Sequence, residues 1–206
     1  MSLFCPPGGG MTENYLSIDD ILMSSEKIPS SFQVSVKGLG FLDPSTHKKD
    51  IDVGTKMDLP LWLAGSLAHS RRKFITTDFT KPYKSTYREI LKADASVVDL
   101  HKLGPHFYSF GQQLLTLEHG ESILLAKTLV LAFSDRFRRI MDWSSNALGC
   151  DTSQRMDGLD EVERTLYRIG QKSLQSFHQW EVGQSRKLET SEFVSRHRKR
   201  KRDAVD

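Results

Sequence analysis

Cysteines are rare in this 206-residue sequence, because only Cys5 and Cys150 occur. A disulfide framework is therefore excluded, and a reducing compartment is favoured. Long hydrophobic runs are also missing: the most apolar stretch, residues 123–133, is interrupted by a lysine and a threonine. It is far shorter than the roughly 20 residues of a membrane-spanning helix. No cationic segment leads into an apolar one near residue 1, so we predict no secretory signal and no contact with a membrane.

Catalytic signatures are absent as well. No phosphate loop ends in Gly-Lys-Ser/Thr, no serine lies in a Gly-x-Ser-x-Gly turn, and no zinc-type cysteine pairs occur. His101 and His106 are separated by the Gly104-Pro105 break, so they do not share a helical face, and hydrogen bonds to backbone carbonyls are their expected role. The sequence predicts a protein that is not an enzyme and binds no metal or cofactor; a hydrolase using either histidine is the least supported alternative.

Positive charge is concentrated at one end of the chain. The formal net charge is +3, but residues 196–202 hold six of the 29 lysines and arginines. Outside residues 196–206 the chain has 23 basic and 24 acidic residues, so the body has no basic excess. Such a tail is typical of a nuclear-import signal, which we favour, or of unspecific attraction to phosphates. The tail residues are Arg196, Arg198, Lys199, Arg200, Lys201 and Arg202.

A second basic group, Arg136, Arg138 and Arg139, could form a phosphate-binding patch. Two of these arginines have i,i+4 acidic neighbours, in the pairs Asp135–Arg139 and Arg138–Asp142. A solvated, self-paired helix face is therefore the favoured interpretation, and DNA contact the alternative.

The first part of the chain mixes short strands and helices. Ser17 is a suitable N-cap for a short helix that we expect to end at Pro29. Apolar residues alternate with polar ones from residue 32, which predicts a strand within 32–42. A helix is expected near residues 59–67 and a closing strand at 74–77.

The remainder is predicted to be helical, with helices at 83–93, 96–117 (broken at Gly104-Pro105), 121–146 and 154–185. The fold class is therefore α+β: a helical bundle domain preceded by a small β-rich domain. Four segments follow: a flexible tail at 1–13, the β-rich domain at 14–80, the helical domain at 82–190 and the basic tail at 191–206.

Apolar residues occupy nearly the whole circumference of the helix predicted at 121–146. This pattern indicates either a central core helix or one that another protein chain covers in part. In the last helix, Leu159, Val162, Leu166 and Ile169 have the 3-4-3 spacing of a packed stripe.

Five blocks of sequence resemble one known family, the third subunit of the GINS complex (partner of Sld five). The blocks are Asn14–Met23, Leu59–Ala64, Val97–Gly111, Phe137–Asp142 and Trp180–Gln184, of which Val97–Gly111 is the most specific. The similarity runs over nearly the whole chain from residue 14 but does not include the 43–56 loop.

This resemblance implies a nuclear, chromatin-associated scaffold subunit of a four-protein complex in DNA replication. Its implied partners are three sister GINS subunits, the MCM ring and a RecJ-like cofactor of the CMG helicase, and a replicative polymerase, with DNA contacted only indirectly or weakly. We expect the two long helices to meet the sister subunits. The predicted interface residues are Leu125, Leu129, Phe133, Phe137, Leu166, Ile169 and Trp180.

Two other functional interpretations concern the ends of the chain. The segment Met1, Ser2, Leu3, Phe4, Cys5, Pro6 and Pro7 could regulate access to a central opening of the complex. A DNA-binding accessory module, acting through the basic tail and the helix arginines, is the main alternative to a scaffold.

Overall fold

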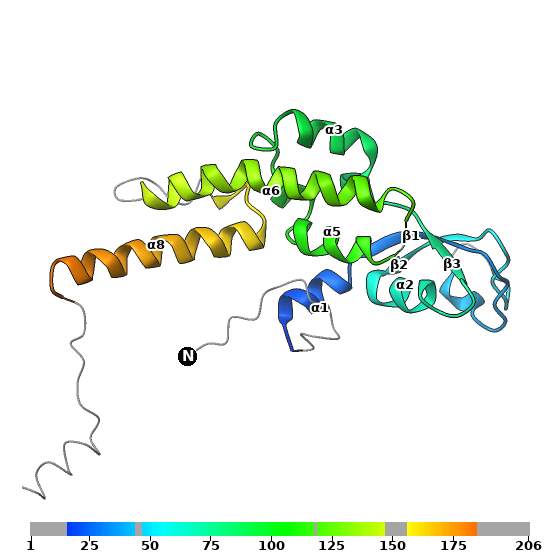
Figure 1. The fold of residues 1–206 in the computed structure, drawn as a ribbon. Helices are drawn as coiled ribbons and strands as arrows, with labels where there is room; N and C mark the ends of the chain where they lie inside the picture. Colours follow the sequence, from blue (N-terminus) through cyan, green and yellow to red (C-terminus); the bar gives the residue numbers. More distant parts are fainter. Residues whose placement is uncertain (1–15, 44–46, 118, 147–155, 185–206) are drawn as a thin grey trace, which may run out of the picture.

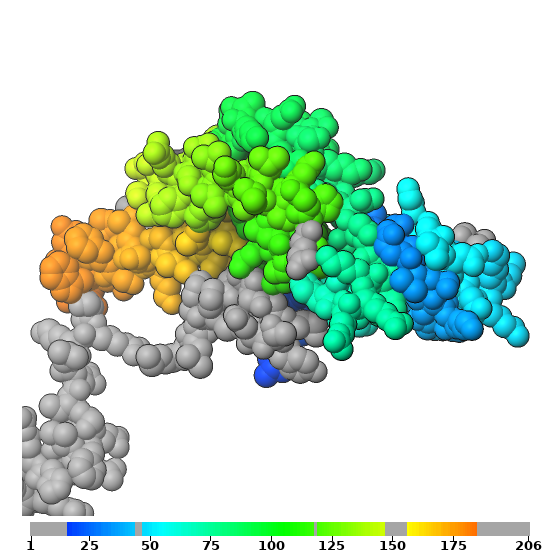
Figure 2. Space-filling model, turned by 45° about the vertical axis from the view of Figure 1, so that its right-hand side comes forward, coloured from blue at the N-terminus to red at the C-terminus, as the bar shows by residue number. Residues whose placement is uncertain are grey.

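The computed structural model describes residues 16–43, 47–117, 119–146 and 156–184 (Figure 1). A small sheet with helix α2 lies at one end of an elongated molecule, and the long helix α8 projects from the other end (Figures 1 and 2). The predictions for the segment Met1–Pro7 and for the tail Arg196–Arg202 concern residues outside these ranges.

The N-terminal part contains α1 (Ile18–Ser24), β1 (Lys27–Phe32), β2 (Lys56–Pro60), α2 (Leu61–Ala68) and β3 (Ile75–Thr77). The three strands form an antiparallel sheet in the order β2-β1-β3. Ser17 caps α1 as predicted, because its side chain accepts a hydrogen bond from the Asp20 N–H at 3.4 Å. The closing strand is also found where it was predicted.

The central strand contains a proline, which the sequence led us to place at a helix end. In β1, Pro29 pairs with Asp58 of β2, between the pairs Ile28–Leu59 and Ser30–Met57. Hydrogen-bonded and non-hydrogen-bonded pairs alternate in an antiparallel ladder, so Pro29 occupies a position that needs no N–H toward β2. On the side that faces β3, Pro29 lies past the end of that strand. There its carbonyl accepts a hydrogen bond, and no N–H is needed.

The strand predicted within 32–42 was wrong in its position, because β1 ends at Phe32. Only Phe32 belongs to β1; Val36 forms an isolated bridge with Ile51, and Gly40–Leu42 is a short 3-10 turn, η1. The alternation does not mark one strand: Phe32 is buried and Val36 partly buried in one cluster with Ile51 and Ala64 of α2, whereas Val34 is exposed.

The helical part begins with the 3-10 turn η2 (Lys81–Tyr83). The helices that follow are α3 (Ser85–Ala93), α4 (Leu100–Leu103), α5 (Phe107–Leu115), α6 (Ser122–Ser145) and α8 (Glu161–Glu181). The break at Gly104-Pro105 separates α4 from α5, as predicted. The last helix starts later than predicted because Asp160 caps it at its N-terminus. The fold class is confirmed as α+β.

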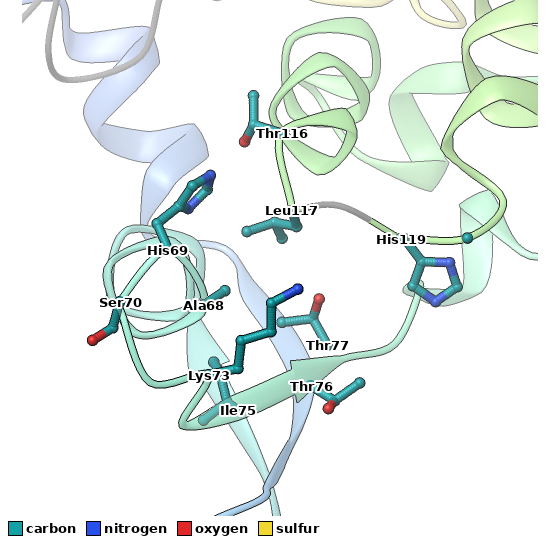
Figure 3. A pocket seen from close by; sticks show the side chains of 11 residues that line it. Ala68, His69, Ser70, Lys73, Ile75, Thr76, Thr77, Thr116, Leu117 and His119 are labelled. Atoms are coloured by element: carbon teal, nitrogen blue, oxygen red, sulfur yellow. The ribbon is translucent and has the colours of Figure 1, made fainter.

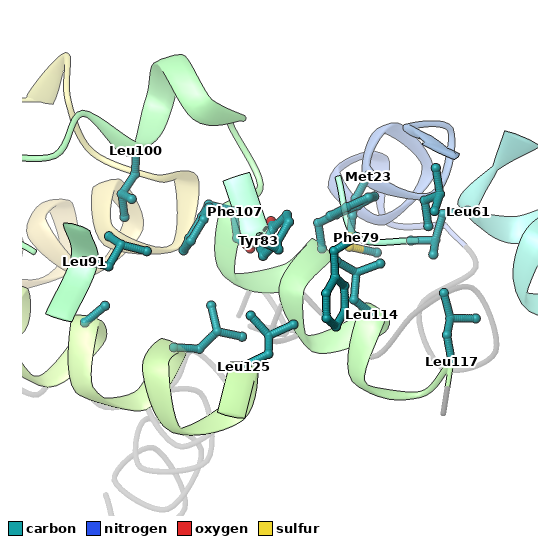
Figure 4. Close-up of a cluster of buried hydrophobic side chains, with 14 of the residues drawn as sticks. Met23, Leu61, Phe79, Tyr83, Leu91, Leu100, Phe107, Leu114, Leu117 and Leu125 are labelled. Atoms are coloured by element: carbon teal, nitrogen blue, oxygen red, sulfur yellow. Dashed lines mark hydrogen bonds between the residues drawn. The ribbon is translucent and has the colours of Figure 1, made fainter. Parts of the chain in front are cut away.

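A continuous hydrophobic core joins the two parts of the chain (Figure 4). Met23, Ile28 and Leu61 from the N-terminal part pack in one cluster with the rings of Tyr83 and Phe107. The Tyr83 hydroxyl donates a 2.7 Å hydrogen bond to the Phe107 carbonyl, and the two rings stack 5.0 Å apart. The domain boundary that we placed near Pro82 thus separates two patterns of secondary structure that share one core.

Helices α6 and α8 run parallel to each other. Arg136 contacts Glu163 near the start of α8, and Ser144 lies against Gly170 two turns further along both helices. Gly170 is needed for this approach, since a Cβ there would lie 2.7 Å from Ser144 Oγ. Beyond this contact α8 continues past the end of α6 (Figure 1).

The two mid-helix glycines, Gly65 and Gly170, should respond oppositely to alanine. No atom lies within 4 Å of a Cβ built at Gly65, so Gly65→Ala should raise the free energy of unfolding by about 0.5–1 kcal/mol through helix propensity. Gly170→Ala should lower it by about 1–3 kcal/mol, because the new methyl group collides with Ser144. Urea unfolding followed by circular dichroism measures both; changes of the same sign would contradict the close packing of Gly170 against Ser144.

Candidate subunit interface

Arg136 on α6 is buried and uses every N–H of its guanidinium group. Nε and Nη2 donate to the two carboxylate oxygens of Glu163 at 2.7 and 2.8 Å. Nη1 donates to the carbonyls of Ala95 and Val98, and Nη2 also donates to Gly158. Since Glu163 has no exposed side-chain surface and Arg136 only 5%, this bidentate pair is a fully desolvated ion pair.

Glu163 and Asp160 connect this ion pair to α5. The Tyr108 hydroxyl donates to Glu163 at 2.9 Å, and burial raises the pKa of Tyr108 above its usual range, which keeps the donor protonated. The Asp160 carboxylate accepts the backbone N–H groups of Phe107 at 2.6 Å and Val162 at 3.1 Å. One carboxylate thus caps the start of α8 and also holds the first residue of α5.

Burial raises the pKa of Asp160 to about 7, and the charge of Glu163 adds to the rise. The two amide hydrogen bonds act in the opposite direction. Burial is the largest single influence on the pKa of Arg136 and lowers it, but the hydrogen bonds and charge of Glu163, together with Tyr108 and Asp160, outweigh burial, so the pKa of Arg136 is raised. The network therefore fixes α8 on α6 with the arginine charged.

Phe137 and Met141 of α6 lie on the same side of the helix pair as Ile169 of α8. On α6, Phe137 and Met141 each follow a buried residue, Arg136 and Ile140, by one position. On α8 the order is reversed, because Ile169 comes one position before Gly170, which contacts α6. A step of one residue turns about 100° around a helix. The two helices are parallel and face each other. A residue one position after the contact on α6 and a residue one position before the contact on α8 therefore point to the same side of the pair.

We call this surface the α6–α8 apolar face and define it by six residues: Phe137, Met141, Leu166, Ile169, Phe177 and Trp180. Five of them are exposed, from 37% for Phe137 to 65% for Trp180, and Leu166 is half-buried. The ring of Phe133, half-buried against Tyr108 at 5.5 Å, closes one end of the face. Exposed apolar side chains gathered in this way mark interaction sites.

The predicted interface residues thus divide into two groups. Phe133, Phe137, Leu166, Ile169 and Trp180 lie on or next to the α6–α8 apolar face. Leu125 and Leu129 instead belong to the chain's own core, with 1% and 8% exposure, and offer almost no surface to a partner. Their burial against α3 and α5 accounts for them without a second chain.

Two members of the face, Met141 and Phe177, were absent from the predicted set. Their signal was present in the sequence: Met141 follows Phe137 by four positions on α6, and Phe177 precedes Trp180 by three on α8. Of the 3-4-3 stripe, Leu159 is buried in the chain's own core, Val162 and Leu166 are half-buried and Ile169 is exposed. The buried face of α8 itself contains Glu163 and Tyr167 instead. A hydrophobic pattern alone cannot rank a glutamate as a core residue.

The helix arginines do not form the self-paired face that the sequence indicated. Among the described residues no ion pair joins Asp135 to Arg139 or Arg138 to Asp142. Arg139 donates to the Ser96 carbonyl at 3.3 Å, and its guanidinium lies 4.6 Å from the centre of the Trp143 ring.

Other kinds of site have little support in the structure. His106 is buried and His101 half-buried, and no group of three side chains that could hold a metal ion occurs among the described residues. None of the described helices is long and apolar enough to cross a membrane.

Two family descriptions match the chain. The GINS complex protein helical bundle domain matches residues 83–182, which include the whole of the α6–α8 pair, and the PSF3 N-terminal domain matches residues 16–69. The helical part is thus a GINS-type bundle.

Curated proteins similar to the chain carry one description, DNA replication complex GINS protein PSF3. The Xenopus laevis protein is 45% identical over 97% of this chain and 95% of its own length. The Homo sapiens protein is 44% identical over 93% and 91%, and the Aspergillus fumigatus protein is 34% identical over 84% and 99%. The chain belongs to the PSF3 family of subunits of the DNA replication complex GINS, which confirms the resemblance found in the sequence.

The raised pKa of Asp160 predicts a stability that falls as pH rises. The folded-state pKa of about 7 lies above the unfolded value of about 3.9, so the folded state binds the extra proton between these values. Stability from this group is complete below pH 4 and is lost as pH rises through 7. Between pH 5 and pH 8 the wild type should lose about 3 kcal/mol relative to Asp160→Asn, in urea unfolding at each pH. Parallel stability curves of the two proteins would contradict this assignment.

Proposed function

We propose that the chain is a non-catalytic scaffold subunit of a heterotetrameric GINS complex. The observation that carries the proposal is the α6–α8 apolar face. A monomer gains nothing from leaving Trp180 and Phe177 in water, since exposed apolar surface forgoes about 25 cal/mol for each Å² that could be buried. A surface that is rigidly held and apolar fits a permanent partner.

The shape of the face indicates what covers it. Two parallel helices with apolar residues spaced by three and four positions present a shallow groove, the surface on which a further helix packs in a bundle. The family match of α6 and α8 to a GINS helical bundle supports a sister GINS subunit as the source of that helix. In this proposal the sister subunit's helix packs on the α6–α8 apolar face beside α5, which contacts Phe133 at one end of that face.

Membership of the family supports a proposal for the wider assembly. We propose that the GINS tetramer containing this chain joins the MCM ring and a RecJ-like cofactor in the CMG replicative helicase, and meets a replicative polymerase there. It would act in the nucleus, on chromatin, during initiation and elongation. In this arrangement ATP hydrolysis belongs to the MCM subunits, in keeping with the lack of a phosphate loop in the sequence.

The alternative function, a DNA-binding accessory module, loses one of its contact residues. Arg136 directs all five of its donors into the protein, so it has none left for a phosphate. Arg138 and Arg139 remain exposed. Binding through these and the tail would weaken steeply with salt, whereas assembly through the apolar face would not.

The two ends of the chain supply further proposals. We assign nuclear import to the tail from Arg196 to Arg202, because six positive charges in seven residues lack any apolar anchor. We also assign regulation of access to a central opening of the complex to Met1–Pro7, which a comparison of DNA access in assemblies with and without these residues would test.

Carboxylates introduced on the apolar face should block assembly without unfolding the chain. Ile169→Glu and Trp180→Glu place a charge where a partner would bury it, so affinity for the sister subunits should fall at least about a hundredfold, or about 2.7 kcal/mol. Both sites are exposed, so the helical circular dichroism signal should be unchanged. Co-purification of the four co-expressed subunits and a binding titration measure the loss.

Gln179→Glu is the matched control for these variants. Gln179 precedes Trp180 and is exposed outside the apolar face, so the same new charge should leave assembly intact. Normal assembly of both Ile169→Glu and Trp180→Glu would refute the scaffold surface. The wild-type chain expressed alone should self-associate, and the sister subunits should suppress this.

Deletion of residues 196–206 should separate import from assembly. The truncated chain should fold and co-purify with its sister subunits as the full chain does, while its nuclear fraction in cells should drop several-fold. Quantitative fluorescence of tagged proteins measures the distribution. If the partners are lost at unchanged expression, the tail is structural instead.

A further inference from the structure

Helix α1 carries its apolar residues on the outside of the molecule. Ile21 and Leu22 follow Ile18 by three and four positions, so these three side chains share one face of the helix. Together with Leu16, which precedes the helix, they are exposed, from 46% for Ile21 to 87% for Leu16. We call this surface the α1 apolar face and define it by these four residues.

The opposite face of α1 is buried and partly polar. Its buried residues are Asp20, Met23 and Ser24. An amphipathic helix on the surface of a monomer buries its apolar stripe and leaves its polar side chains in water. In α1 this order is largely reversed. Such a reversal is understandable for a helix whose outer side is covered by another chain.

The fold holds α1 firmly, so the α1 apolar face is a preformed surface. Ser17 caps its first turn, and Met23 belongs to the large core that joins the two parts of the chain. The Leu61 N–H donates a 2.9 Å hydrogen bond to the Glu26 carbonyl, which ties the end of α1 to the start of α2. A surface that is ordered in advance loses little conformational entropy when a partner binds.

The α1 apolar face is separate from the other surface features of the chain. Figure 3 shows a polar pocket of about 380 Å³ between the end of α2, strand β3 and the segment after α5. None of the described residues that line this pocket belongs to α1. The α6–α8 apolar face is likewise made by other helices (Figure 1). An occupant of the α1 apolar face therefore needs its own contact.

The charge of the segment around α1 has one sign. Residues 1–26 contain four acidic residues, Glu13, Asp19, Asp20 and Glu26, and no lysine, arginine or histidine. Asp19 is exposed and lies three positions before Leu22, at the edge of the α1 apolar face. A second copy of this chain would bring a like charge to the contact, and an anionic lipid surface would repel it. The charge favours a protein partner with a cationic rim.

We propose that α1 is a ligand helix that inserts into an apolar groove of a sister subunit, with lysines or arginines on the rim of that groove. Recognition of a helix in a groove uses apolar residues at positions i, i+3 and i+4, which Ile18, Ile21 and Leu22 supply. The proposal rests on the scaffold function and adds to it a second contact, apart from the α6–α8 apolar face. Two contacts on separate elements hold a subunit in its assembly more firmly than either contact alone.

The first test is photo-crosslinking in the co-expressed four-subunit assembly. Benzoylphenylalanine replaces Ile18 in one variant and, as a matched control, Val53 in another. Val53 is 62% exposed in the turn before β2, so it resembles Ile18 in size and exposure but lies outside the α1 apolar face. Illumination should join the chain to a sister subunit from position 18, and several-fold less from position 53.

Charge reversal tests the cationic rim. Asp19→Lys should weaken binding of the chain to its sister subunits about tenfold, because it places a positive charge beside the rim. Glu89→Lys, the matched control, makes a comparable charge reversal at an exposed position of α3 and should weaken binding less than about threefold. A binding titration measures both variants, and circular dichroism checks that they are folded.

The outcomes separate this proposal from the scaffold function. An assembly that forms normally but gives no crosslink from position 18 would refute the α1 contact and leave the scaffold function standing. Failure of the wild-type chain to assemble at all would refute the scaffold function itself. A crosslink from position 18 to a second copy of the chain, or to the chain's own basic tail, would replace the sister subunit by another occupant. Equal losses in Asp19→Lys and Glu89→Lys would refute the cationic rim.

Discussion

The buried ion pair between Arg136 and Glu163 determines how the helical part is built. Desolvating two charges is costly, and the cost is offset here because every donor of the guanidinium group has an acceptor. The acceptors come from the segment before α4, from the residues before α8 and from α8 itself. One side chain on α6 thus holds two segments that are distant in the sequence, residues 95–98 and 158–163. Neither charged partner can be removed without leaving an uncompensated buried charge.

The parallel arrangement of α6 and α8 creates the surface that we assign to a sister subunit. With Glu163 and Tyr167 against α6, the apolar residues at the preceding positions of α8 turn outward together with Phe137 and Met141. The rotation of α8 about its own axis therefore has two results. Its polar residues contact α6 within the chain, and its apolar residues are left to contact a partner. Such an arrangement suits a subunit that folds on its own framework and is completed by its complex, because the ion pair fixes the orientation of α8 before any partner arrives.

Much of the fold could be predicted from local signals, and the failures have physical causes. The Ser17 cap and the break at Gly104-Pro105 are properties of single residues, so the sequence indicated both. Pro29 was misjudged because its tolerance in β1 depends on which neighbour each backbone group faces, which only strand pairing decides. The apolar face was found in part. Leu129 and Phe137 are equally hydrophobic in pattern, and only the packing of α3 and α5 distinguishes core from surface.

The central claim is that a partner covers the α6–α8 apolar face in the assembled complex. Hydroxyl-radical footprinting of the purified four-subunit assembly tests it through two tryptophans of the same chain. Trp180 on the face is 65% exposed and Trp62 on α2 is 52% exposed, so an uncovered chain would oxidise both at similar rates. The account predicts that in the assembly Trp180 is oxidised several-fold more slowly than Trp62. Equal rates, or faster oxidation of Trp180, would contradict it.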